Sequence, residues 1–170
     1  QSENDLKKFL KNNKKNNYKI HILGAGSNTL FRDGGFEGAV IKLGSNFSYT
    51  KLTKKDEIEV GAATMDKKLS DFALENSLSG FEFLSCIPGS VGGAITMNSG
   101  CYGYEISQVF SSLKAINFKG EIEIFKKNEI KFFYRGNNLK KNLIILSAIF
   151  KGNLSNKEKI FEKQKKFIEK

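Results

Sequence analysis

The stretch GFEFLSCIPGSVGGAITMNSGCYG, residues 80–103, is the most unusual segment of this 170-residue chain. It contains Pro88, the only proline, and five of the 16 glycines lie between positions 89 and 103, among hydroxyl and amide side chains. Glycine adopts positive φ without strain and lets a ligand approach the backbone closely. The stretch therefore predicts a ligand groove lined by backbone. The alternative is a conformationally demanding crossover loop that binds nothing.

Short helices and strands alternate on both sides of this stretch. Apolar residues at helical spacing predict helices over three ranges: 4–14, 65–77 and 156–170. Alternating or continuous apolar runs predict strands over seven ranges: 18–23, 36–43, 47–53, 56–63, 108–118, 121–125 and 143–150. Lys119-Gly120 indicates a hairpin turn between two of them. Because hairpins are mixed among helices without a regular βαβ series, the pattern predicts an α+β fold.

The charge of the chain favours an anionic ligand over a nucleic acid. The net charge is +10, yet Arg32 and Arg135 are the only arginines among 28 basic residues, and the lysines are spread along the sequence. Proteins that bind nucleic acids concentrate their charge, use arginine for bidentate contacts and interleave aromatic residues. We therefore expect no nucleic-acid partner, and a lysine-rich solvated surface that attracts an anion.

The compartment and the metal content are also constrained. No apolar run approaches the roughly 20 residues of a membrane-spanning helix, and no leader of charged and then apolar residues opens the chain. Cys86 and Cys101 do not form a C-x-x-C pair, and His21 is the only histidine, so we expect neither a metal site nor a disulfide framework. These features predict a cytoplasmic protein that does not bind a membrane.

A second glycine motif, Gly24-Ala25-Gly26-Ser27-Asn28, follows the predicted strand 18–23. Consecutive small residues after a strand expose backbone N–H groups, which bind phosphate oxygens. Thr29 occupies the place of the third glycine in the dinucleotide-binding motif G-x-G-x-x-G, and no helical pattern follows. We therefore expect no Rossmann site here, and the open choice is between an anion-binding turn and a plain tight turn.

Tyr134-Arg135, within KFFYRGNN (131–138), is the third candidate. A guanidinium group binds a carboxylate or phosphate through two parallel hydrogen bonds, and it stabilises a developing enolate. The alternative, an ordinary surface ion pair, is favoured as long as this motif is considered alone.

Three motifs in this order resemble the UDP-N-acetylenolpyruvoylglucosamine reductase (MurB) family. They are ILGAGSNTLFRDGGFEGAVIKLG (22–44), SGFEFLSCIPGSVGGAITMNSGCYG (79–103) and FFYRGNNL (132–139). The resemblance runs from about residue 4 to the C-terminus. It implies a flavoenzyme of bacterial peptidoglycan precursor synthesis, whose FAD-binding domain is of the vanillyl-alcohol-oxidase (PCMH) type, with two α+β lobes and the cofactor in the cleft between them.

The resemblance also implies roles for particular residues. Arg135 falls on the catalytic arginine of the family, which stabilises the enol intermediate, and no metal is implied. The residues implied to bind the pyrophosphate and the flavin of FAD are Gly24, Ala25, Gly26, Ser27, Asn28, Thr29, Ile87, Pro88, Gly89, Ser90, Gly92 and Gly93.

The implied reaction has two steps. NADPH reduces the flavin, and the reduced flavin passes a hydride to the enolpyruvyl double bond of UDP-N-acetylglucosamine-enolpyruvate, which yields UDP-N-acetylmuramate. Two alternatives keep the same FAD motifs: a non-catalytic FAD-binding remnant, and another flavoprotein oxidase of the same fold.

The domain boundaries follow from the same resemblance. Residues 1–35 are expected to be part of the first FAD-binding lobe, 36–152 the second lobe, and 153–170 a helix leading to a substrate domain. The family's opening N-T-x-x-x-x-G-G-like segment and its G-S-x-F-K-N-P-like motif, which carries the proton-donating serine, do not occur. We therefore expect an incomplete first lobe, weak FAD binding and no complete reduction by this chain alone.

Overall fold

The structure, a computed structural model, describes residues 2–169, and the largest sheet among them has five antiparallel strands. Their order across the sheet is β3 (Thr50–Lys54), β4 (Glu57–Gly61), β12 (Leu143–Lys151), β8 (Phe110–Asn117) and β9 (Ile122–Lys126). The hairpin predicted at Lys119-Gly120 joins β8 to β9, and Gly120 has a φ of 84°. The expected mixture of hairpins and helices is confirmed.

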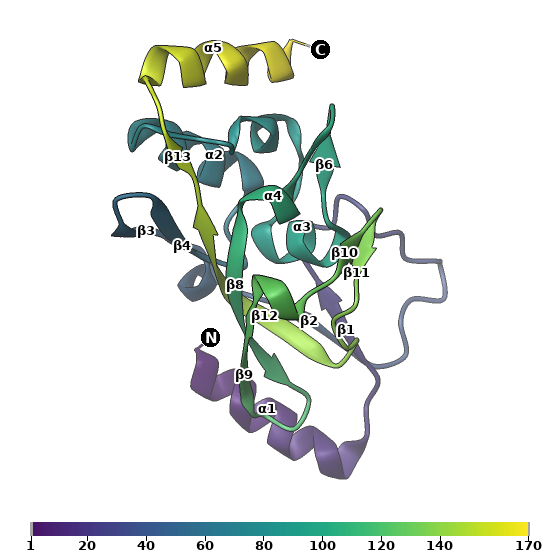
Figure 1. The fold of residues 1–170 in the computed structure, drawn as a ribbon. Coiled ribbons are helices and arrows are strands. Elements are labelled where there is room, and N and C mark those ends of the chain that lie inside the picture. The colour runs from purple at the N-terminus through teal and green to yellow at the C-terminus, as the bar shows by residue number, and fades with distance from the viewer. Residues whose placement is uncertain (1, 170) are drawn as a thin grey trace.

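Helices cover this sheet on both faces: α1 (Glu3–Asn16) lies on one face, and α2 (Asp66–Glu75), α3 (Val91–Met97) and α4 (Ile106–Val109) lie on the other. Helix α5 (Lys157–Ile168) packs on α2 and on residues 82–86 instead. Figure 1 shows α1 and α5 at opposite ends of the molecule, with the sheet between them. The remaining short elements are η1 (Ser45–Phe47), β5 (Leu78–Ser79), η2 (Glu82–Cys86), β6 (Gly100–Cys101), β7 (Tyr104–Glu105), η3 (Lys127–Glu129), β10 (Phe132–Phe133), β11 (Gly136–Asn137) and β13 (Asn153–Leu154).

Strand β12 contributes to two hydrophobic clusters, because successive side chains of a strand point to opposite faces. Ile145 packs in the larger cluster with α2 and α3, whereas Ile144 and Leu146 pack in the smaller cluster with α1. A β-bulge between Ile145 and Ser147 shifts the register, so that Phe150 also faces the larger cluster. The apolar run of β12 is therefore buried on both faces.

A separate two-stranded parallel sheet consists of β1 (Ile20–Leu23) and β2 (Ala39–Lys42). Both strands are shorter than the predicted 18–23 and 36–43, and their isoleucines pack against the smaller cluster. The two strands pair across the predicted lobe boundary at residues 35 and 36. That boundary, like the one at 152 and 153, stays a prediction.

Two local predictions need correction. Residues 91–97 form α3 within the glycine-rich stretch, because Val91, Ala94 and Ile95 make one apolar face that is fully buried despite the two glycines between them. Gln108 and Val109 belong to α4 rather than to the strand predicted over 108–118. Within residues 2–169, no helix has the length and apolar character needed to cross a membrane.

Candidate functional site

The two glycine motifs, far apart in the sequence, meet at Gly24 and Ser90. A Cβ atom at Gly24 would lie 2.9 Å from Ser90 Oγ and 3.9 Å from Gly93 Cα. Ser90 is buried and sits directly before α3. A side chain at position 24 would press on the Ser90 hydroxyl group, so glycine there allows the two motifs to approach closely.

The turn 24–29 exposes its backbone. Gly26 has a φ of 93°, and the space that its Cβ would occupy is open. The N–H of Thr29 donates to the Gly26 carbonyl at 3.3 Å, and residues 25–29 are exposed. The chain continues to β2 without a helix, in agreement with the expectation that no Rossmann turn is present. Exposed N–H groups in such a turn are suited to an anion.

Backbone hydrogen bonds hold the glycine motif 87–93 against the end of β4. Asp66 N–H donates to the Gly89 carbonyl at 3.0 Å, and Gly92 N–H donates to the Ala62 carbonyl at 2.9 Å. A Cβ at Gly89 would lie 2.5 Å from Asp66 Oδ2, and one at Gly92 would lie 3.1 Å from the Ala62 Cβ. Packing inside the protein therefore requires both glycines, in addition to any role toward a ligand.

Asp66 is a functional candidate that sequence reasoning missed. Its side chain is fully buried below Gly89, and neither carboxyl oxygen has a hydrogen-bond partner among the described residues. Burial raises the pKa of Asp66 to about 7. In the sequence, an aspartate at the start of a helix is typical of an ordinary helix N-terminus, so no pattern distinguishes it.

Arg135 lies in a tight turn between β10 and β11. Its φ is 58°, a left-handed conformation that is uncommon outside glycine, and its Cζ is 5.7 Å from the centroid of the Tyr134 ring. Arg135 is exposed, and within residues 2–169 no carboxylate forms an ion pair with it. The surface ion pair that the motif suggested is therefore not found in the described part of the chain.

Asn98, the buried residue that ends α3, connects that helix to the Arg135 turn. Its Nδ2 donates to the Phe133 carbonyl at 3.2 Å and to Glu105 Oε2 at 2.9 Å. On the other side of the turn, Asn137 Nδ2 donates to the Ile95 carbonyl at 2.9 Å. Two asparagines thus tie both strands of the β10–β11 hairpin to the C-terminal end of α3.

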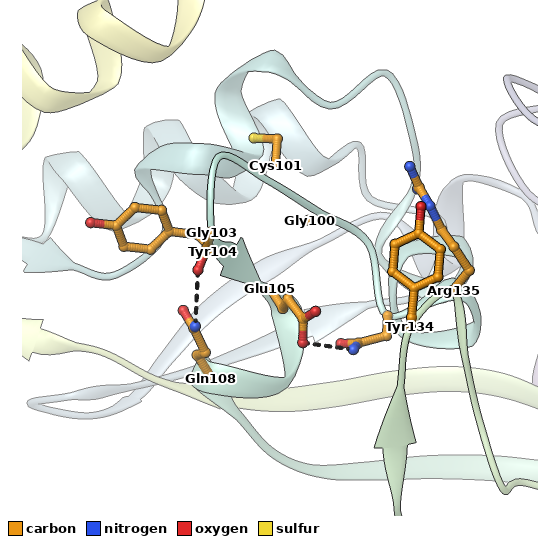
Figure 2. A pocket seen from close by; sticks show the side chains of 9 residues that line it. Gly100, Cys101, Gly103, Tyr104, Glu105, Gln108, Tyr134 and Arg135 are labelled. Carbon is orange, nitrogen blue, oxygen red and sulfur yellow. Dashed lines mark hydrogen bonds between the residues drawn. The ribbon is translucent and has the colours of Figure 1, made fainter.

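A pocket of about 430 Å³ opens beside this turn. Figure 2 shows Tyr134 and Arg135 on one side and Tyr104 and Cys101 on the other. The residues lining it are Asn98, Gly100, Cys101, Gly103, Tyr104, Glu105, Gln108, Tyr134 and Arg135. Arg135 is the only predicted site residue among them, and none of the predicted cofactor-binding residues lines this pocket.

The fold and the two glycine motifs define a class of protein. The sequence pattern of the family described as "FAD binding domain" matches residues 1–126. The chain belongs to this family of FAD-binding domains.

Within that class, the relatives are reductases. The chain is 54% identical over 142 residues to the UDP-N-acetylenolpyruvoylglucosamine reductase of Pelagibacter ubique, a match that covers 84% of this chain and 47% of that protein. The solved structure of UDP-N-acetylenolpyruvylglucosamine reductase (MurB) from Thermus caldophilus is similar with a TM-score of 0.81 and 26% identity, over 98% of this chain and 59% of that one. The predicted family resemblance is confirmed.

The same fold occurs in an oxidase. The structure of 6-hydroxy-D-nicotine oxidase from Arthrobacter nicotinovorans gives a TM-score of 0.63 at 13% identity, over 88% of this chain and 34% of that one. At this identity the likeness concerns the fold alone, and it confirms the predicted fold class. The chain spans about half the length of the curated relatives it matches.

Proposed function

We propose that the chain is the FAD-binding portion of a UDP-N-acetylenolpyruvoylglucosamine reductase. Such an enzyme reduces UDP-N-acetylglucosamine-enolpyruvate to UDP-N-acetylmuramate with NADPH, a cytoplasmic step of peptidoglycan precursor synthesis. The observation that carries the proposal is the close approach of Gly24 to Ser90, which brings the two glycine motifs together. The similarity to the Pelagibacter reductase supports the choice of reaction.

The two motifs are suited to a diphosphate cofactor. In the proposed site the exposed N–H groups of the turn 24–29 donate to phosphate oxygens, and the loop 87–90 with Gly92 and Gly93 supports the opposite side. Exposed lysines across the chain add a positive field that attracts the dianion. When bound, FAD supplies the two-electron chemistry that accepts a hydride from NADPH and donates it to carbon.

Arg135 is proposed to act on the substrate. Its guanidinium group is exposed at the pocket, without a carboxylate partner in the described chain, so its hydrogen-bonding capacity is free for a ligand carboxylate. In this role it orients the enolpyruvyl carboxylate and stabilises the negative charge that develops on it during reduction.

Flavin retention tests the cofactor part of the proposal. The purified chain is incubated with FAD and desalted, and its visible absorbance is recorded before and after NADPH is added. Since we expect weak FAD binding, only part of the flavin absorbance should be retained, and NADPH should bleach the flavin that stays bound. A matched pair of variants refines the result: Gly24→Val forces a side chain onto Ser90, whereas Gly34→Val lies in the same exposed loop with open space around it. Gly24→Val should lose flavin and Gly34→Val should keep it, while equal retention by both would contradict the proposed site.

A second measurement distinguishes the reductase from a non-catalytic FAD binder. Arg135→Ala should leave FAD retention unchanged and weaken the binding of UDP-N-acetylglucosamine-enolpyruvate, measured by its perturbation of the flavin spectrum. If Arg135→Ala changes neither property, the chain is an FAD binder without a reductase role for this arginine.

A further inference from the structure

Cys86 and Cys101 lie face to face at the junction of the two regions described above. Their Sγ atoms are 3.3 Å apart, and both cysteines are free and half-buried. Cys86 ends η2 and directly precedes the loop 87–90, whereas Cys101 belongs to β6 and lines the pocket beside Arg135 (Figure 2). One sulfur is therefore attached to the proposed cofactor loop and the other to the pocket wall.

The surroundings hold the two sulfurs in place. Both contact the carbonyl oxygen of the fully buried Phe83, Cys86 Sγ at 3.2 Å and Cys101 Sγ at 3.5 Å. A disulfide bond is about 2.05 Å long, so the sulfurs have to approach by only about 1.2 Å. Gly100 and Gly103 flank Cys101 closely, and Gly103 has a φ of 83°, so the short hairpin β6–β7 contains residues that adjust their backbone easily.

We propose that Cys86 and Cys101 form a dithiol site that is converted reversibly to an intramolecular disulfide by exchange with low-molecular-weight disulfides. In the first step a cysteine thiolate attacks one sulfur of the small disulfide, the small S–S bond breaks, and one small thiol leaves. In the second step the other cysteine attacks the sulfur of the first, and the second small thiol leaves. Two electrons pass from the protein to the small disulfide, and the two protons of the cysteines end on the two released thiols.

The environments of the two cysteines suggest the order of attack. Burial, followed by the hydrogen bond and the charge of Cys86, raises the pKa of Cys101 to about 12. At neutral pH Cys101 is therefore protonated, and exchange begins at Cys86. Once Cys86 carries the small thiol, Cys101, whose Sγ lies 3.3 Å from that of Cys86, is the resolving thiol.

The disulfide would close the chain segment 86–101, which contains α3 together with Gly89, Gly92 and Gly93. Closing that segment restricts the unfolded chain more than the folded one. The oxidised chain should therefore unfold at a higher temperature than the reduced chain, and addition of a dithiol reductant should reverse the difference. This inference does not depend on the proposed reductase activity, because the thiols are measured without cofactor or substrate.

Mass spectrometry after treatment with oxidised glutathione tests the site. The reduced chain is incubated with oxidised glutathione, unreacted thiols are trapped by alkylation, and the products are weighed. We expect a monomer with no alkylated cysteine and no glutathione adduct. Each single variant, Cys86→Ser or Cys101→Ser, leaves one cysteine without its partner thiol. Glutathione that becomes attached to the remaining cysteine should stay there as a mixed disulfide.

Repeating the exchange in denaturant distinguishes the effect of the native geometry from the effect of the short distance between the two cysteines in the sequence. The equilibrium constant for disulfide formation should be at least about tenfold larger in the folded chain than in the denatured chain, because the folded state holds the two sulfurs together. Equal equilibria in the two states would overturn the inference. Two alkylated thiols, a stable glutathione adduct on the wild-type chain, or disulfide-linked dimers would overturn it as well.

Discussion

Asp66 is a buried carboxyl group whose ionisation opposes folding. In the folded chain its oxygens have no hydrogen-bond partner among residues 2–169, and burial raises its pKa from 3.8 to about 7. The folded state therefore binds the proton more tightly than the unfolded state does. The free energy of unfolding should fall as the pH rises from about 4 to about 7, because the unfolded chain ionises Asp66 first.

The first prediction concerns Asp66→Asn, which removes this titration and keeps the shape of the side chain. As the pH rises from 4 to 8, the free energy of unfolding of the variant should increase relative to that of the wild type. The difference should reach roughly 4 kcal/mol at most, since a shift of one pKa unit corresponds to about 1.4 kcal/mol. Urea unfolding at several pH values measures the difference. Glu75→Gln removes an exposed carboxyl group from the same helix and serves as the control. Parallel pH profiles for the wild type and Asp66→Asn would contradict the prediction.

The second prediction concerns the contact between Gly89 and Asp66. The Cβ of Gly89→Ala would lie 2.5 Å from Asp66 Oδ2, so the variant should lose about 1–3 kcal/mol of stability through overpacking. If Asp66 is the cause, the double variant with Asp66→Ala should lose less than the sum of the single variants. Denaturant unfolding of the four proteins in this cycle measures the coupling. Additive losses would show that another contact limits position 89.

At the scale of elements, the β10–β11 hairpin depends on its hydrogen bonds to α3. Asn98→Ala removes the bonds to Phe133 and Glu105 and should destabilise the hairpin by about 1–3 kcal/mol, because buried polar groups lose their partner. Cleavage by an arginine-specific protease provides a local measurement, since Arg32 and Arg135 are the only arginines of the chain.

The third prediction is that Asn98→Ala accelerates cleavage at Arg135 by roughly tenfold or more, because local opening of the hairpin becomes easier. Cleavage at Arg32, in the exposed loop between β1 and β2, should keep its rate and acts as an internal control. Equal acceleration at both arginines would indicate global destabilisation and would contradict a specific role for Asn98.

Some of these elements can be predicted from the sequence, whereas others cannot. The hairpin at Lys119-Gly120 and helix α2 follow from local patterns, and the structure contains both. Helix α3 was missed because glycines at 92 and 93 lower the local helix propensity, while tertiary burial of Val91 and Ile95 decides the outcome. The roles of Asp66 and Asn98 could not be predicted, because each depends on contacts with a segment distant in the sequence.

At the scale of the whole molecule, α5 packs over η2 and α2 and supports the pocket wall. Gln164 Nε2 donates to Ser70 Oγ at 3.0 Å, and the ring of Phe167 lies against that of Tyr104 with centroids 5.4 Å apart. Phe167 is buried, whereas Phe161 on the same helix is 56% exposed.

The fourth prediction compares these two phenylalanines. Phe167→Ala should lower the free energy of unfolding by about 3 kcal/mol, because it leaves a cavity between α5 and the pocket wall. Phe161→Ala makes the same chemical change at an exposed position and should have a much smaller effect. Thermal unfolding of both variants checks this, and similar losses would mean that α5 does not pack on the rest of the chain as described.

The fold class could be predicted from a family resemblance that three motifs carry together, since the three in this order are far more specific than any one of them. The close approach of Gly24 to Ser90 could not be predicted, and neither could the position of Arg135 at a pocket that no predicted cofactor-binding residue lines. Both depend on how β1–β2, α3 and β10–β11 pack together. The roles proposed for the glycines and for Arg135 stay predictions until ligand binding is measured.

The bulged strand β12 links the stability of distant parts of the chain. It supplies Ile144 and Leu146 to one hydrophobic cluster and Ile145 and Phe150 to the other, so loss of its pairing would disturb both clusters. The β1–β2 pair packs against the smaller cluster and carries the exposed turn 24–29. A substitution that loosens the smaller cluster should therefore also loosen the support of the turn 24–29, although it does not contact the proposed cofactor surface.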